Sequence, residues 1–164
     1  MNVCFAPCPV VFDLDGTLID SAPDIHACVN AVLRLNGARL LTLDQVRGFI
    51  GGGVDLLWRR VIGATGLPPE AHRDLVDSFM TRYHDATALT RLYPNAIEAL
   101  GLLADRGHPL GICTNKPIGP TRAILGHFGI TQLFGTVIGG DSLPQKKPDP
   151  APLRAAFAAL GADP

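Results

Sequence analysis

The sequence predicts an α/β protein in which a parallel sheet alternates with helices and an all-helical segment follows the first strand. Short apolar runs at 10–12, 110–113 and 136–138 end in polar or glycine residues, as expected for strands buried on both faces of a parallel sheet. Helical patterns alternate with the second and third runs, which is typical of βαβ units. Residues 20–88 show helical patterns and no strand pattern.

The inserted segment is expected to hold a series of helices. Pro23 suits the first turn of a helix that begins after Ser21 and stops at Gly37. Thr42 and Gln45 have the capping-box spacing of a second, short helix. A glycine run then interrupts the pattern, and two further helices are expected at 54–63 and 69–85.

The second half of the chain repeats a helix and a strand. Helices are expected from Pro94 to Arg106, at 119–127 and from Asp149 to Leu160, and they flank the second and third strands. Three short strands make a thin sheet with an exposed apolar edge. Residues 161–164 stand where a further strand would begin, so we expect the chain to be a truncated version of a longer α/β domain.

Composition excludes several classes of protein. The 164 residues are 47% hydrophobic, which suits one folded domain, and 14 basic against 15 acidic residues give a net charge of −1. A nucleic-acid or anionic-membrane partner is therefore not expected. No apolar run approaches the ~20 residues of a membrane span, and the N-terminus lacks the pattern of a signal peptide. We expect a cytoplasmic protein with reduced thiols, since no C-x-x-C pair occurs among Cys4, Cys8, Cys28 and Cys113.

The strongest chemical pattern is Asp13-x-Asp15-Gly16-Thr17, directly after the first strand. It places two carboxylates at the carboxyl edge of the sheet, where open α/β sheets bind ligands. An ionised Asp can attack phosphorus and a protonated Asp can act as an acid, so the pair suits phosphoryl transfer. The alternative is a plain Asp-rich turn in which Gly16 adopts a positive φ.

Two further polar groups follow the next two strands. Thr114 and Asn115 could bind phosphate oxygens, although a helix N-cap is the commoner use of these residue types. Lys147 could neutralise phosphate charge and hold the carboxylate of the nucleophile, although a solvated charge before a helix is the commoner arrangement. Because all three groups follow successive strands, their joint placement favours a single site.

These motifs resemble those of the haloacid dehalogenase superfamily of phosphotransferases. Within it, Phe12–Ser21, Thr114–Asn115–Lys116 and Lys147–Pro150 are most similar to the motifs of bacterial phosphoglycolate phosphatases. The resemblance implies a Rossmann-like core at 1–19 and 89–164, incomplete at its C-terminus, with a helical cap at 20–88. It implies Mg²⁺-dependent hydrolysis of 2-phosphoglycolate to glycolate and phosphate, so the expected partner is a small phosphorylated metabolite.

The resemblance also implies residue roles. Asp13 would be the nucleophile and a Mg²⁺ ligand, and Asp15 would be the general acid and base with its backbone carbonyl on the metal. Lys147 would complete the charge neutralisation. The expected substrate-binding residues are Gly16 and Thr17 in the first loop, Thr114 and Asn115 on the phosphoryl group, and Gly51, Gly52 and Gly53 in the cap. The backbone N–H groups of these three glycines could meet a small carboxylate, unless they form a plain interhelix loop.

One departure from the family pattern concerns the metal. A fourth motif on the next strand supplies further carboxylates in the family, whereas Asp141 lies on the wrong strand and Asp163 lacks the pattern. We therefore expect weak activity from this 164-residue chain. The alternatives are a sugar-phosphate mutase of the same superfamily and an inactive fragment. A dehalogenase lacks the second aspartate, and a phosphonate hydrolase needs a cap lysine that residues 20–88 do not contain.

Overall fold

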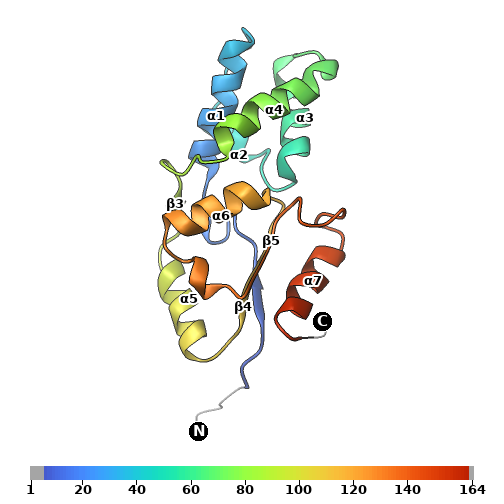
Figure 1. Cartoon of the computed structure of the whole chain (residues 1–164). Helices are drawn as coiled ribbons and strands as arrows, with labels where there is room; N and C mark the ends of the chain where they lie inside the picture. Colours follow the sequence, from blue (N-terminus) through green and yellow to red (C-terminus); the bar gives the residue numbers. More distant parts are fainter. Residues whose placement is uncertain (1–5, 163–164) are drawn as a thin grey trace.

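A computed structural model describes residues 6–162, in which three parallel strands form the central sheet (Figure 1). The strands are β1 (Val10–Phe12), β4 (Leu110–Cys113) and β5 (Thr136–Ile138), in the order β1-β4-β5. Val11 aligns with Gly111, and Ile112 aligns with Val137. The predicted strands and their parallel arrangement are confirmed. The expectations that concern Cys4, Asp163 and Pro164 lie outside the described residues.

Three helices cover the sheet. They are α5 (Ala96–Asp105), α6 (Ile118–His127) and α7 (Ala151–Ala159), each within two residues of the sequence prediction at its start. Helix α7 contacts all three strands, and α5 and α6 lie on the opposite side of the sheet (Figure 1). A short 3-10 turn, Thr131–Leu133, precedes β5 and contacts both α5 and α6. The sheet is therefore the middle layer of a three-layer arrangement.

Four helices between residues 22 and 83 form a helical unit with a core of its own. They are α1 (Ala22–Leu35), α2 (Leu43–Arg47), α3 (Gly53–Thr65) and α4 (His72–Tyr83). The capping box of α2 is present. Two details differ from the prediction. The segment 69–71 is a 3-10 turn rather than the start of α4, and Gly53 begins α3 rather than ending a loop.

The helical unit and the sheet bury separate apolar clusters. In the helical unit, Trp58 meets the ring edge of Phe79 at 5.8 Å between centroids, and Phe79 lies 4.7 Å from Tyr83. Around the sheet, Leu14 and Ile112 are fully buried with side chains of α5 and α6. Two clusters of this kind support two structural units that meet along a seam.

A two-stranded antiparallel ribbon, absent from the prediction, connects the two units. Strand β2 (Ile19–Asp20) pairs with β3 (Arg91–Leu92), with Ile19 opposite Leu92. Each strand has only two residues, which is too short to show a period-2 pattern. The ribbon brings the start and the end of the helical segment together, so both connections to the sheet run side by side.

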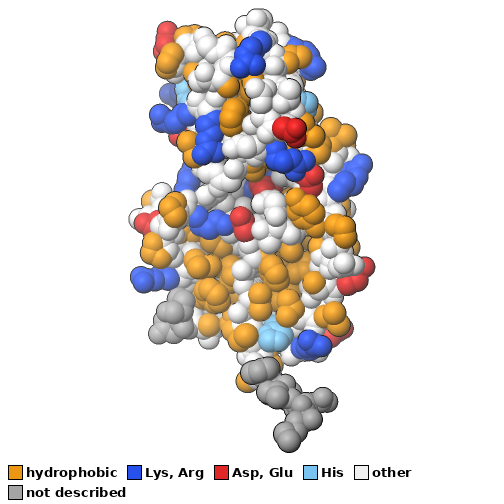
Figure 2. Space-filling model, turned by 180° about the vertical axis from the view of Figure 1, so that it is seen from behind, with side chains coloured by type: hydrophobic (Ala, Val, Ile, Leu, Met, Phe, Trp, Pro, Cys, Tyr) orange, Lys and Arg blue, Asp and Glu red, His pale blue; other side chains and the backbone are white. Residues whose placement is uncertain are grey.

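The expected apolar edge of the sheet is present. Strand β1 pairs with β4 on one side and with no strand among residues 6–162 on the other, and its three residues are only half-buried. Figure 2 shows hydrophobic side chains gathered over the half of the molecule that holds the sheet. Cys28 and Cys113 are buried free thiols, whereas Cys8 is an exposed one. None of the described helices is long and apolar enough to cross a membrane.

Candidate active site

The parallel register gathers the predicted residues at one edge of the sheet. Asp13 follows β1, Thr114 follows β4, and the loop after β5 returns to carry Lys147. Gly140 in that loop packs so closely against the carbonyl of Asn115 that a Cβ atom there would overlap with it. A glycine is therefore required for the β5 loop to approach the end of β4.

Asp13 and Lys147 form an ion pair at this edge. Lys147 Nζ lies 3.0 Å from Asp13 Oδ1, which also accepts a hydrogen bond from the backbone N–H of Leu14 at 2.8 Å. The Asp13 side chain is 42% exposed. Its Oδ2 atom accepts no hydrogen bond from residues 6–162 and is free to meet a ligand. The contacts to Oδ1 thus orient the carboxylate, and its other oxygen can meet a ligand.

Asp15 lies deeper than Asp13, with a side chain only 12% exposed. Its Oδ1 atom accepts a hydrogen bond from Ser21 Oγ at 2.5 Å and another from Lys116 Nζ at 3.3 Å. Two adjacent carboxylates therefore have different surroundings, one open and one enclosed.

The first loop turns sharply between these aspartates and β2. Gly16 adopts φ +80°, so the turn does use the positive φ that the sequence suggests, and its N–H donates to the carbonyl of Ile19 at 2.8 Å. Thr17 is exposed, and its backbone N–H bonds to the carbonyl of Leu14. Thr17 lines neither cavity described below, and its predicted role in binding substrate stays a prediction.

Asn115 connects three segments through its side-chain amide. Its Nδ2 atom donates to the carbonyls of Gly51 and Lys147, and its Oδ1 atom accepts from the N–H of Lys147, each at 3.0 Å. The amide therefore fixes the backbone beside Lys147 and joins the glycine loop of the helical unit to the sheet edge. Its predicted contact with a phosphoryl group stays a prediction.

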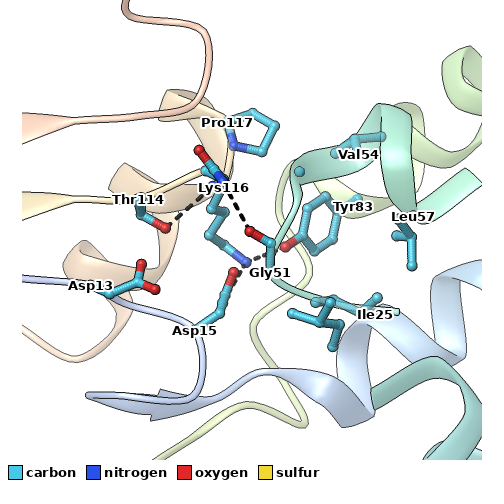
Figure 3. Close-up of a pocket in the computed structure, with 13 residues that line it drawn as sticks. Asp13, Asp15, Ile25, Gly51, Val54, Leu57, Tyr83, Thr114, Lys116 and Pro117 are labelled. Carbon is cyan, nitrogen blue, oxygen red and sulfur yellow. Dashed lines mark hydrogen bonds and ion pairs between the residues drawn. The ribbon is translucent and has the colours of Figure 1, made fainter. Parts of the chain in front are cut away.

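A cavity lies between the sheet edge and the helical unit (Figure 3). Asp13, Asp15 and residues 114–117 line one side. The other side consists of apolar or glycine positions of the helical unit together with one phenol: Ile25, Ile50, Gly51, Gly53, Val54, Leu57 and Tyr83. Gly51 and Gly53 thus line this cavity, whereas Gly52 is not among the lining residues. The predicted contact of the three glycines with substrate stays a prediction.

A second cavity opens on the other side of Asp15. Gly16, Ser21 and Tyr93 line it together with an ion pair between Arg47 and Asp20. The guanidinium of Arg47 donates to both carboxylate oxygens of Asp20, at 2.8 and 3.0 Å. This hydrogen bonding holds the pKa of Asp20 below its usual value. The pair ties α2 to the β2–β3 ribbon.

Lys116 is the polar residue whose importance sequence reasoning missed. Its side chain is 1% exposed, and its ammonium donates to both Asp15 and the hydroxyl of Tyr83. Burial lowers the pKa of Lys116, partly opposed by the charge of Asp15, and burial raises the pKa of Tyr83 well above its usual value. The only available signal was position, since Lys116 directly follows Thr114–Asn115 and a lysine after a strand is ordinarily exposed.

The residues present fit a weakly held Mg²⁺ ion. Mg²⁺ takes six oxygen ligands and usually keeps several waters beside one or two carboxylates. The free Oδ2 atom of Asp13 suits such an ion, and the backbone carbonyl of Asp15 is the other expected ligand. Within the described part of the chain, no group of three His, Cys, Asp or Glu side chains could hold a metal.

This fold and edge geometry define the haloacid dehalogenase-like hydrolases, and the chain belongs to that family. The family profile matches residues 10–164. A phosphoglycolate phosphatase of Cereibacter sphaeroides is 54% identical over 154 residues, which cover 92% of this chain and 71% of that protein. One of Rhodospirillum rubrum is 41% identical over 164 residues, covering 96% of this chain and 68% of that protein. The predicted family is thereby confirmed.

Solved structures similar to this chain come from the same class of enzyme as these relatives. The crystal structure of a predicted phosphoglycolate phosphatase from Haemophilus somnus 129PT matches with a TM-score of 0.87 at 33% identity, covering 98% of this chain and 74% of that one. The crystal structure of a predicted phosphatase from Clostridium acetobutylicum matches with a TM-score of 0.77 at 25% identity, covering 94% of this chain and 70% of that one. The α/β fold with a parallel sheet is therefore shared with hydrolases longer than this chain.

Proposed function

We propose that this protein is a Mg²⁺-dependent phosphatase that hydrolyses 2-phosphoglycolate through an aspartyl-phosphate on Asp13. The observation that carries the proposal is the pair formed by Asp13 and Lys147, 3.0 Å apart at the edge that also holds Asp15. The identity of 54% to a protein named phosphoglycolate phosphatase supports the choice of substrate.

In the first step, a carboxylate oxygen of Asp13 attacks phosphorus, and the bond from phosphorus to the glycolate oxygen breaks. Asp15 gives its proton to that oxygen, so glycolate leaves as a neutral alcohol at its hydroxyl. Lys147 balances negative charge on the phosphoryl oxygens. The hydroxyl of Thr114 and the backbone N–H of Asn115 would hold these oxygens in place.

In the second step, a water molecule attacks the phosphorus of the aspartyl-phosphate. Asp15, now ionised, accepts a proton from this water, and the bond between phosphorus and Asp13 breaks. Inorganic phosphate leaves, Asp13 is again a carboxylate, and Asp15 is again protonated. One carboxylate therefore serves both steps from its enclosed position.

Mg²⁺ would be held by the carboxylate oxygen of Asp13 that does not attack phosphorus, by the backbone carbonyl of Asp15 and by water. When bound, it supplies positive charge that stabilises the phosphoryl oxygens. The described residues offer few side-chain ligands, so we expect weak binding and slow turnover by this chain.

The helical segment 20–88 would serve as the cap that selects the substrate. Its apolar side chains and the glycine loop close the cavity above Asp13. The backbone N–H groups of the loop at Gly51–Gly53 would receive the carboxylate of 2-phosphoglycolate. Apart from the phenol of Tyr83, the remaining lining of this side is apolar, which favours a short substrate with no further charged group.

The test is phosphate release from 2-phosphoglycolate with and without Mg²⁺, by the parent chain, by Asp13→Asn and by Asp105→Asn. Asp105 is exposed on α5, away from the sheet edge, so it is a matched control. We expect Mg²⁺-dependent release from the parent and from Asp105→Asn, and none from Asp13→Asn. Release that persists in Asp13→Asn would contradict the mechanism.

Other outcomes separate the alternatives. Conversion of one sugar phosphate into its isomer, with little free phosphate, would identify a mutase instead. Release from other small phosphate esters but not from 2-phosphoglycolate would retain the phosphatase and overturn its substrate. A parent chain that aggregates and unfolds without cooperativity would favour the fragment interpretation.

A further inference from the structure

The ammonium of Lys116 occupies a buried position between two parts of the molecule. It lies 3.3 Å from Asp15 Oδ1 and donates to the hydroxyl of Tyr83 (Figure 3). It also lies 4.4 Å from the centroid of the Tyr83 ring. A buried charge is costly unless its partners are well placed, so the two partners together determine where this ammonium lies.

These two partners belong to different units. Tyr83 is the last residue of α4, is 3% exposed, and packs against Phe79 in the core of the helical unit. Asp15 belongs to the loop after β1. Lys116 itself is fixed to the sheet edge, because its N–H donates to Thr114 Oγ1 at 3.2 Å and its carbonyl accepts from the N–H of Gly140 at 2.8 Å. The side chain therefore bridges the seam.

The second donor to Asp15 is also connected to the helical unit. Ser21 stands at the N-cap position of α1, yet its side chain makes no capping hydrogen bond. Its hydroxyl donates instead to Asp15 Oδ1 at 2.5 Å. Capping is the usual use of a serine at this position. Both side-chain donors to Asp15 are thus connected to the helical unit. Ser21 directly precedes α1, and Lys116 is hydrogen-bonded to Tyr83 at the end of α4.

We propose that Lys116 is a positioning residue which, together with Tyr83, makes the orientation of the Asp15 carboxylate depend on the position of the helical unit. When the helices lie against the sheet edge, Tyr83 holds the ammonium beside Asp15, and Ser21 holds the same oxygen from the other connection. When the helices move away, both hydrogen bonds are lost together. This inference rests on the proposed role of Asp15 as acid and base.

The kinetic test uses Tyr83→Phe and Lys116→Met with two substrates. 2-Phosphoglycolate has an alkoxide leaving group that needs a proton, whereas p-nitrophenyl phosphate has a leaving group that does not. A misplaced acid costs about 10²-fold, so we expect kcat/KM to fall about tenfold to 100-fold for 2-phosphoglycolate and far less for p-nitrophenyl phosphate. In an Asp15→Asn background, Lys116→Met should have no further effect. Equal losses on both substrates would overturn the proposal.

The control is Val61→Ala, which shortens a fully buried side chain of α3 outside the cavity lining. This substitution weakens the packing of the helical unit without touching Lys116 or Asp15. Any fall in kcat/KM should therefore be the same for both substrates. Tyr83→Phe keeps the ring that packs against Phe79, which protects the fold. A selective loss in Val61→Ala equal to that in Tyr83→Phe would also overturn the proposal.

A second measurement needs no activity and therefore separates this inference from the proposed function. Amide hydrogen exchange is followed over residues 14–20 in the parent, in both variants and in Val61→Ala. We expect several-fold faster exchange there in Tyr83→Phe and Lys116→Met but not in Val61→Ala. Unchanged exchange over 14–20 in both variants would overturn the proposal even if the chain releases no phosphate.

Discussion

Lys147 Nζ lies 3.0 Å from Asp13 Oδ1, although the two residues stand near opposite ends of the chain. The parallel order β1-β4-β5 explains the distance, because β1 and β5 both end at the same edge of the sheet. The hydrogen bonds of Asn115 to the backbone of Lys147 then fix the loop that carries this lysine. A cation is thus held beside the carboxylate to which we assign the attack on phosphorus.

Replacing Lys147 tests this arrangement. Lys147→Gln keeps much of the length of the side chain but removes its charge, so phosphoryl charge would be less well balanced. Loss of one such preorganised group costs about 10²–10³-fold in kcat. Steady-state phosphate release measures the effect, with Lys146→Gln as the neighbouring control. Equal effects of the two substitutions would contradict a specific role for Lys147.

Ser21→Ala should separate stability from activity. A serine that caps a helix contributes about 0.5–2 kcal/mol, but the hydroxyl of Ser21 bonds to Asp15 instead. Ser21 is buried, so losing its hydrogen bond to Asp15 should lower the free energy of unfolding by about 0.5–1.5 kcal/mol, with a clear fall in kcat. Urea unfolding and phosphate release measure the two. A large stability loss with unchanged kcat would show that the hydroxyl acts on the helix.

Asp24 should be the main polar determinant of stability at the connection between the units. It is 5% exposed, and its carboxylate accepts hydrogen bonds from the N–H groups of Leu89 and Thr90 and from Thr90 Oγ1. Asp24→Ala leaves these buried donors without a partner, which should lower the free energy of unfolding by roughly 2–4 kcal/mol. Asp77→Asn, an exposed change on α4, should stay within about 0.5 kcal/mol. Urea unfolding measures both variants. Similar changes in the free energy of unfolding for Asp24→Ala and Asp77→Asn would contradict the structural role given to Asp24.

The ion pair of Asp20 and Arg47 should make a small contribution to stability that depends on pH. Hydrogen bonding from Arg47 lowers the pKa of Asp20 in the folded state. Such a group stabilises the fold at pH values above its unfolded pKa, and this stability is lost as the pH falls through the folded pKa. Because the two side chains are 29% and 44% exposed, we expect only about 0.2–1 kcal/mol at neutral pH.

The measurement for this pair compares the parent with Asp20→Asn by urea unfolding between pH 7 and pH 3. The difference between them should be largest at neutral pH and should shrink below about pH 4, near the usual pKa of an aspartate. Added salt should reduce it as well. A difference that grows as the pH falls would contradict the assignment.

Much of the sheet and the helical segment could be predicted from local patterns. Each strand of the sheet is a short apolar run followed by polar or glycine residues, and Thr42 with Gln45 marked α2 through its capping box. The placement of Asp13, Thr114 and Lys147 at one edge followed from the parallel order alone. These features depend on residues close together in the chain or on a general rule of sheets.

Contacts between distant segments could not be predicted in this way. The β2–β3 ribbon has two residues in each strand and exists because the two ends of the helical segment meet. The burial of Lys116 depends on the hydroxyl of Tyr83, which only the packing of α4 brings to the sheet edge. Nothing in the sequence near Tyr83 indicates a lysine as its partner.

Transfer of the phosphoryl group to Asp13 can be tested by mass spectrometry of acid-quenched protein after mixing with 2-phosphoglycolate and Mg²⁺. We expect a peptide containing Asp13 to gain the mass of one phosphoryl group, and the same peptide of Asp13→Asn to gain none. Phosphate release without phosphorylation of that peptide, and equally fast in Asp13→Asn, would contradict it.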